Sequence, residues 1–145
     1  MKKLIAILAA IVTFAACRTT DLYYWGGNIN GTTTYERLAY QSYDKQSPES
    51  LCNLIVAYED MVTRPAGTRQ VPPPGICAEY GYLLLQPGTA QTFAASATDA
   101  QKRVFGSSDF NEVFRQRGEE MMKKELELYP ESEKFIAPLV KRFTE

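Results

Sequence analysis

The residues that could carry out chemistry in this chain are cysteines and carboxylates, because the sequence contains no histidine. Histidine is the commonest general base and metal ligand, so its absence removes most acid–base and metal mechanisms. The three cysteines, Cys17, Cys52 and Cys77, cannot form an ordinary closed zinc site without a further ligand. We therefore expect no metal, no cofactor and no catalytic cysteine, since nothing is present to activate a thiol.

Glutamates are the remaining catalytic candidates, and Glu36, Glu79 and Glu112 are examples. A suitably spaced carboxylate pair can hydrolyse a glycosidic bond, which makes a cell-wall hydrolase a remote alternative function. Solvated glutamates are nevertheless common on every helical protein. The sequence therefore predicts that the protein is not an enzyme and has no catalytic residues.

Composition narrows the class of protein further. The chain has 145 residues, a length typical of one domain, and its 45% hydrophobic and 23% charged residues indicate a globular fold. Its 16 basic and 17 acidic residues give a net charge of -1. Since no excess of cations is available to neutralise phosphates, we expect no nucleic-acid partner.

Cys17 follows a segment with the layout of a secretory signal. Lys2 and Lys3 precede an apolar run over 4–16, which is too short for a comfortable transmembrane helix and ends in small residues. The sequence Phe14-Ala15-Ala16-Cys17 resembles the bacterial lipobox. The alternative interpretation is a buried N-terminal helix with an incidental cysteine.

The lipobox resemblance implies that residues 1–16 are a signal peptide cleaved before Cys17, and that acyl chains such as palmitate are attached to Cys17. Arg18 rather than aspartate follows, which by resemblance to the sorting rule of bacteria with two membranes favours the outer membrane. Several acyl chains would anchor the protein stably in the lipid bilayer. Whether it faces the periplasm or the exterior stays open.

Cys52 and Cys77 could form a disulfide in such an oxidising compartment. We place them near the starts of two successive helices, which lie at opposite ends of a simple antiparallel hairpin. A disulfide needs Cα atoms within about 7 Å of each other. Both a bridge and two separate buried thiols stay open, and the separate thiols are favoured.

Residues 17–33 are expected to form a lipidated tether with an extended aromatic segment at 22–25 and a loop at 26–33. Tyr23, Tyr24 and Trp25 are our candidates for contact with a partner. The alternatives place this segment at the level of the lipid headgroups or packed back onto the helical body.

Residues 34–145 are expected to form a helical-repeat-like domain. Capping residues, prolines and apolar steps of three and four predict helices over 35–46, 48–64, 75–86, 89–96, 98–105, 108–129 and from 131 onward. The apolar face of the first helix is expected to include Tyr43, and that of the last helix Phe135.

The charge-dense part of the 108–129 helix is expected to be a solvated face. Glu119 and Lys123, and likewise Glu120 and Lys124, have the spacing of ion pairs on one helix. Gly118 within this stretch indicates either a close approach of another helix or a tolerated weak point.

These helices, joined by short turns marked with proline, predict an all-α fold of antiparallel helix hairpins. Residues 78–88 resemble the first helix of a tetratricopeptide repeat, with Gly81 at the close-packing position, and residues 125–130 resemble the end of its second helix. The spacing between the two exceeds that of an ordinary repeat, which implies a segment inserted at about 89–113.

Four short motifs occur along the chain, each once. They are Leu-Tyr-Tyr-Trp-Gly at 22–26, Tyr-Glu at 35–36, Pro-Pro-Gly followed by Ala-Glu-Tyr-Gly-Tyr-Leu within 73–83, and Tyr-Pro-Glu-Ser at 129–132. In combination they resemble an uncharacterised family of bacterial outer-membrane lipoproteins with a domain of unknown function. The resemblance implies a protein often encoded beside a curli-export-pore-like lipoprotein and a third small lipoprotein. It brings no established activity.

Together these patterns predict an outer-membrane-anchored lipoprotein that acts as a non-enzymatic scaffold or accessory subunit of a cell-envelope, secretion-like assembly. Repeat-like helical folds mainly bind other proteins, so we expect other envelope lipoproteins as partners. The alternative function is a regulator or adaptor of an envelope enzyme.

Overall fold

The computed structural model describes residues 20–144, so the predicted signal peptide and Cys17 lie outside the described residues. A small antiparallel hairpin, β1 (Asn28–Ile29) and β2 (Thr32–Thr33), precedes the helices. The helical elements are α2 (Thr34–Lys45), α3 (Pro48–Thr63), α4 (Ile76–Leu84), α5 (Thr89–Ser96), α6 (Asp99–Arg103), α7 (Phe110–Leu128), the 3-10 turn η1 (Pro130–Ser132) and α8 (Glu133–Thr144). The prediction of a mostly helical protein is confirmed.

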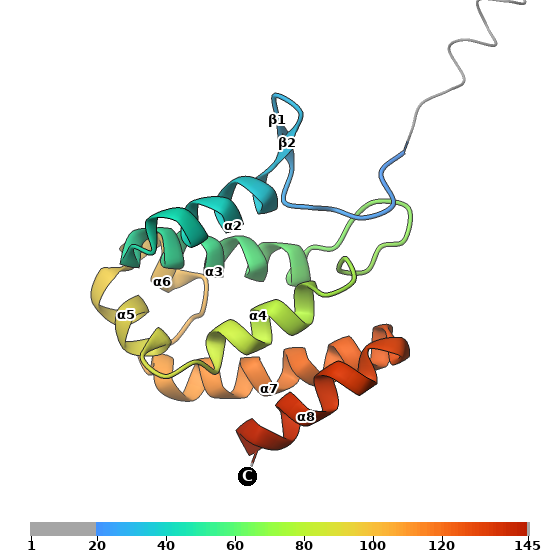
Figure 1. The fold of residues 1–145 in the computed structure, drawn as a ribbon. Helices are drawn as coiled ribbons and strands as arrows, with labels where there is room; N and C mark the ends of the chain where they lie inside the picture. The colour runs from blue at the N-terminus through green and yellow to red at the C-terminus, as the bar shows by residue number, and fades with distance from the viewer. Residues whose placement is uncertain (1–19, 145) are drawn as a thin grey trace, which may run out of the picture.

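The long helices are stacked in chain order, from α2 through α3, α4 and α7 to α8 (Figure 1). The short helices α5 and α6 lie at one end of this stack, where α5 packs against both α3 and α7. The β1–β2 hairpin projects from the opposite side of α2 to α3, at the top of Figure 1. Successive helices therefore bury one another's apolar faces in a layered arrangement.

Local sequence explains where α2 and α3 begin. Thr33 caps α2 in a capping box with Glu36, and Ser47 caps α3 together with Ser50 and a proline at the first helical position. These caps satisfy backbone N–H groups that have no partner within the helix. The predicted starts of both helices are confirmed to within one residue.

A pair of glycines brings α4 and α7 into close contact. A Cβ atom on Gly81 would lie 2.7 Å from the carbonyl oxygen of Gly118, and one on Gly118 would lie 2.6 Å from Leu85 Cγ. A side chain at either position would therefore force a neighbouring group to shift. Gly118 therefore marks a close helix approach rather than a tolerated weak point.

The segment 89–107 is held by a cluster of phenylalanines. Ring centroids of Phe93, Phe105, Phe110 and Phe114 lie 5.1–6.4 Å apart, mostly in edge-to-face arrangements. Gln101 of α6 also donates a 2.8 Å hydrogen bond to Asn53 of α3. These contacts fix the part of the chain that the sequence describes least clearly.

The predicted loop at 26–33 is wrong in one respect, because it contains the β1–β2 hairpin. Asn30 and Gly31 at its tip both have positive φ, 55° and 84°, as the tight turn between two right-twisted strands requires. An Asn-Gly pair between extended residues is the strongest short-range hairpin signal. The sequence therefore carries a hairpin signal at Asn30-Gly31 within the predicted loop.

Two residues predicted on apolar helix faces are instead exposed. Tyr43 in the last turn of α2 is 81% exposed and Phe135 in the first turn of α8 is 66% exposed. Each helix lies at an outer edge of the stack, where α2 packs mainly on α3 and α8 mainly on α7. A helix with one long neighbour buries a narrower stripe than its apolar pattern suggests.

Cys52 and Cys77 are free thiols, and both are buried. They lie near the starts of α3 and α4, as predicted. The structure therefore has two separate thiols rather than a disulfide.

Candidate functional site

The chain that follows the predicted lipid anchor lies along the helical body, and we call residues 20–27 the strap. The carbonyl oxygens of Asp21 and Leu22 accept hydrogen bonds of 3.0 Å from the backbone N–H groups of Thr68 and Arg69. Gly67 permits this approach, because a Cβ there would lie 2.8 Å from the Leu22 oxygen and its φ is +84°. The strap thus pairs with the α3–α4 loop through its backbone.

The strap also continues into α2 through its backbone. The carbonyl oxygens of Trp25 and Gly27 accept hydrogen bonds from the N–H groups of Tyr35 and Thr34, at 3.1 and 3.0 Å. Both ends of the strap are therefore fixed to the body. The predicted tether shortens accordingly, because it reaches the helical domain by Asp21.

The aromatic side chains of the strap contact the body in three places. The Tyr24 hydroxyl donates a 3.0 Å hydrogen bond to Asp60 Oδ2, and Asp60 is also paired with Arg64. The Trp25 ring lies 5.3 Å from the Tyr35 ring, centroid to centroid. Tyr23 lies near Tyr129, whose pKa is raised by burial and by this neighbour, and whose hydroxyl donates a 2.6 Å hydrogen bond to the Pro72 carbonyl. Of the alternatives for this segment, packing back onto the helical body describes Tyr24 and Trp25.

A groove of about 560 Å³ lies between the strap and the α3–α4 loop. Its walls include Tyr23, Trp25 and Thr68, and the carboxylate of Asp21 also lines it. Aromatic rings and small polar groups are thus presented together. The three predicted contact residues, Tyr23, Tyr24 and Trp25, all line this groove, and their contact with a partner stays a prediction.

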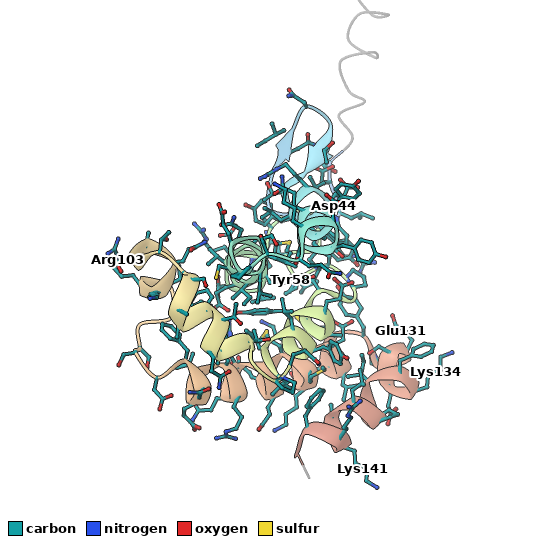
Figure 2. All side chains as sticks on the ribbon, turned by 60° about the vertical axis from the view of Figure 1, so that its left-hand side comes forward. Asp44, Tyr58, Arg103, Glu131, Lys134 and Lys141 are labelled. Atoms are coloured by element: carbon teal, nitrogen blue, oxygen red, sulfur yellow. The ribbon has the colours of Figure 1, made fainter. Side chains whose placement is uncertain are left out.

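A ladder of aromatic rings leads from the groove into the core. Ring centroids are 6.0 Å apart for Tyr35 and Tyr58, and 5.5 Å apart for Tyr58 and Tyr80. The Tyr35 and Tyr58 hydroxyls both donate to Glu79 Oε2 at 2.8 Å. Burial, together with the bond to Glu79, raises the pKa of Tyr35 to about 12. Figure 2 shows Tyr58 in the interior between the helices.

A carboxylate inside the stack, unlike the exposed Glu79, joins three helices. Glu59 of α3 accepts two hydrogen bonds from the Arg117 guanidinium of α7, at 2.8 and 3.1 Å, and a third from the Tyr80 hydroxyl of α4 at 2.7 Å. Arg117 also bonds Glu120 at 2.8 Å. The expected pairing of Glu120 with Lys124 is therefore wrong, and so is that of Glu119 with Lys123, since Glu119 bonds Arg115 instead.

Each glutamate considered as a catalytic candidate has a structural partner. Glu36 accepts from Thr33 at the start of α2, which lowers the pKa of this exposed carboxyl. Glu79 accepts from Tyr35 and Tyr58 of the ladder, and Glu112 binds Arg115 at 2.7 Å. These contacts hold the start of α2, the rings of the ladder and the surface of α7.

Sequence reasoning missed the most exposed aromatic pair in the described chain. Tyr40 is 69% exposed and Tyr43 is 81% exposed, and their spacing of three places both on the outer face of α2. Neither forms part of the aromatic ladder. Large exposed aromatic side chains are enriched where proteins contact one another.

No helix among residues 20–144 is long and apolar enough to cross a membrane. Over the same range, no group of three or more cysteine or acidic side chains is arranged to hold a metal ion. Searches against protein families, curated proteins and solved structures found no match to the chain.

Proposed function

We propose that this protein is an outer-membrane-anchored lipoprotein that acts as a non-enzymatic scaffold or accessory subunit of a cell-envelope assembly. The observation that carries the proposal is the outward face of α2, where Tyr40 and Tyr43 are exposed side by side. Tyrosine supplies a large contact area at low cost in conformational entropy. A helix that follows a membrane-anchored strap and presents two such side chains is suited to holding a second protein at the membrane.

The packing of α4 and α7 supports a tetratricopeptide-like hairpin as the core of this scaffold. In the resemblance, Gly81 occupies the close-packing position of the first helix, and in the structure it meets Gly118 of α7. Helices α5 and α6 then form the greater part of the inserted segment. We infer that the insertion interrupts a regular repeat surface and leaves α2 as the accessible binding face.

The first experiment tests anchoring. The Cys17→Ser variant should lose lipid labelling and partition out of the membrane fraction, because the thiol that carries the acyl chains is absent. The Cys52→Ser variant is a matched control, since that thiol is buried in the body. A Cys17→Ser protein that remains fully membrane-bound would overturn the anchoring.

The second experiment tests the binding face. Partners are recovered by affinity capture from membranes solubilised in mild detergents, using wild type and a Tyr40→Ala/Tyr43→Ala variant. We expect the variant to lose most of the partner that wild type recovers. Phe135→Ala is the control, since Phe135 is an exposed aromatic on α8 at the other edge of the stack.

The outcomes discriminate between assignments. Loss with Tyr24→Ala/Trp25→Ala but not with Tyr40→Ala/Tyr43→Ala would move the contact to the strap, provided that helical circular dichroism is retained. Recovery of the protein only as a free monomer in several detergents would contradict the scaffold function. A change in a captured enzyme's activity on adding the protein would favour the regulator or adaptor.

A further inference from the structure

The distance between the anchor and the body limits how the molecule can lie on the membrane. Four residue steps separate Cys17 from Asp21, whose carbonyl oxygen is already bonded to Thr68. Such a segment spans at most about 14 Å when fully extended. A domain of about 125 residues has a radius of gyration of about 14 Å, so the part of the body next to Asp21 must stay close to the bilayer.

The surface around Asp21 has the composition expected at a membrane interface. Leu22 in the strap is 58% exposed and Ile29 in β1 is 59% exposed. The strap and the β1–β2 hairpin lie together at one end of the molecule, at the top of Figure 1, and α8 lies at the other end. Aromatic rings of Tyr23 and Trp25 line the groove beside the strap, together with Asn28 and Thr33 of the hairpin. Tyrosine and tryptophan are enriched at the headgroup level of membranes.

We propose that the strap and the β1–β2 hairpin form the face that rests on the bilayer, with Leu22 and Ile29 entering the interface and the rings of Tyr23 and Trp25 at the level of the headgroups. This inference rests on the anchoring of Cys17 in the proposed function. It goes beyond anchoring, because it assigns one orientation to the body. In this orientation α8 points away from the membrane. The Tyr40–Tyr43 face of α2 is then open to a partner.

Fluorescence quenching by a nitroxide-labelled lipid, measured on the full lipidated protein, tests the orientation. The protein is placed in vesicles of phosphatidylethanolamine and phosphatidylglycerol, with or without a lipid that carries a nitroxide on its headgroup. A thiol-reactive fluorophore is attached to Ile29→Cys or, as the control, to Lys141→Cys near the end of α8 (Figure 2). Labelling is selective, because Cys52 and Cys77 are buried.

We expect the probe at position 29 to lose most of its emission with the nitroxide lipid and the probe at position 141 to keep it. Flotation of the same vesicles reports anchoring separately. Protein that floats with an unquenched probe at position 29, or with equal quenching at both positions, overturns the orientation while anchoring stands. Protein that does not float overturns both. If emission at position 29 changes with the amount of protein per vesicle but not with the fraction of nitroxide lipid, the face contacts a second copy of the protein instead of the bilayer.

A second arm uses the single tryptophan of the sequence, Trp25, without any label. The Leu22→Ser/Ile29→Ser variant should float as wild type does but show weaker quenching of Trp25 by the nitroxide lipid. Val104→Ser removes an exposed apolar side chain elsewhere and should leave the quenching unchanged. Equal quenching of Trp25 in all three proteins would overturn the assigned role of Leu22 and Ile29.

Discussion

Glu125 is a buried carboxylate that completes a helix to which it does not belong. Helix α4 begins after Gly75, which has no side chain to act as a cap. Glu125 of α7 supplies the missing acceptor, with hydrogen bonds of 2.8 Å from the Gly75 N–H and 3.3 Å from the Ala78 N–H. Glu125 is only 2% exposed to solvent. A carboxylate at a helix N-terminus also interacts favourably with the helix dipole.

The pH dependence of stability should report this burial. Burial raises the pKa of Glu125 above its ordinary 4.5 despite the bonds from backbone N–H groups. Between the two pKa values the folded protein binds more protons than the unfolded chain, so this residue makes the free energy of unfolding fall as pH rises. The unfolding free energy of wild type minus that of Glu125→Gln, both from urea titrations, should therefore become smaller as pH rises from 4.5 towards neutral.

Glu112→Gln serves as the control of opposite sign. Arg115 and Gln116 lower the pKa of Glu112, so its contribution is present above the ordinary pKa and is lost as pH falls. Glu112 is exposed, and its effect should be small. Parallel pH profiles for wild type and Glu125→Gln would show that the Glu125 carboxyl titrates alike in the folded and unfolded states.

The roles of Glu125 and Arg117 could not be predicted from the sequence. Both lie in a run of charges whose most common structure is a solvated helix face, and several of its members are indeed exposed. Their partners, Gly75 and Glu59, are 50 and 58 residues away along the chain. Local spacing specifies pairs within one helix, whereas these contacts exist only after α7 has packed against α3 and α4.

At the level of elements, the contact between α4 and α7 depends on two glycines. We expect Gly81→Ala to lower the free energy of unfolding by about 1–3 kcal/mol, because its Cβ would meet backbone atoms of α7 that cannot rotate away. Gly118→Ala should cost less, since its nearest neighbour is the half-buried side chain of Leu85. Urea denaturation of both variants measures the order.

A double-mutant cycle supplies the control for this prediction. Gly81→Ala and Gly118→Ala alter one contact, so their effects should not be additive. Gly88→Ala is also strained, because Gly88 has φ +85°, but nothing lies within 4 Å of its added Cβ. Its cost should therefore add to that of either helix variant, and coupling between positions 81 and 88 would contradict the steric explanation.

The Glu59–Arg117 pair should be the most sensitive connection between elements. Arg117→Ala leaves Glu59 without its charged partner inside the stack, which typically costs about 3–5 kcal/mol. Arg117→Lys keeps the charge but loses the two-pronged hydrogen bond, and we expect a smaller loss. Arg115→Ala removes an exposed pair and should change stability little. Equal effects at positions 115 and 117 in urea denaturation would contradict the structural assignment.

The sequence predicted elements better than it predicted their partners. Ser47-Pro48 and Pro130 specify helix boundaries locally, which explains why the bounds of α3 and α7 differ from expectation by only a residue or two. The exposure of Tyr43 and Phe135 depends on whether another helix covers their faces. The groove depends on pairing of the strap with Thr68 and Arg69, for which the sequence offers only the glycine at position 67 as a signal.

At the scale of the whole molecule, the two free thiols report whether the stack opens as one unit. Cys52 lies in α3 and Cys77 in α4, and both are buried in the core that these helices share. Burial raises the pKa of Cys77 to about 12 and also raises that of Cys52. Since the thiolate is the reactive form, labelling requires an opening that exposes each sulfur to water.

We expect the native Cys17→Ser protein to react with a thiol reagent slowly and at the same rate at both positions, because α3 and α4 pack directly on each other. In denaturant two thiols should react at once, whereas a disulfide would leave none. Lys141→Cys is the accessible control and should react immediately in the native state. Faster labelling of Cys77 than of Cys52, followed by mass spectrometry, would show that α4 opens separately and that the stack consists of more than one cooperative unit.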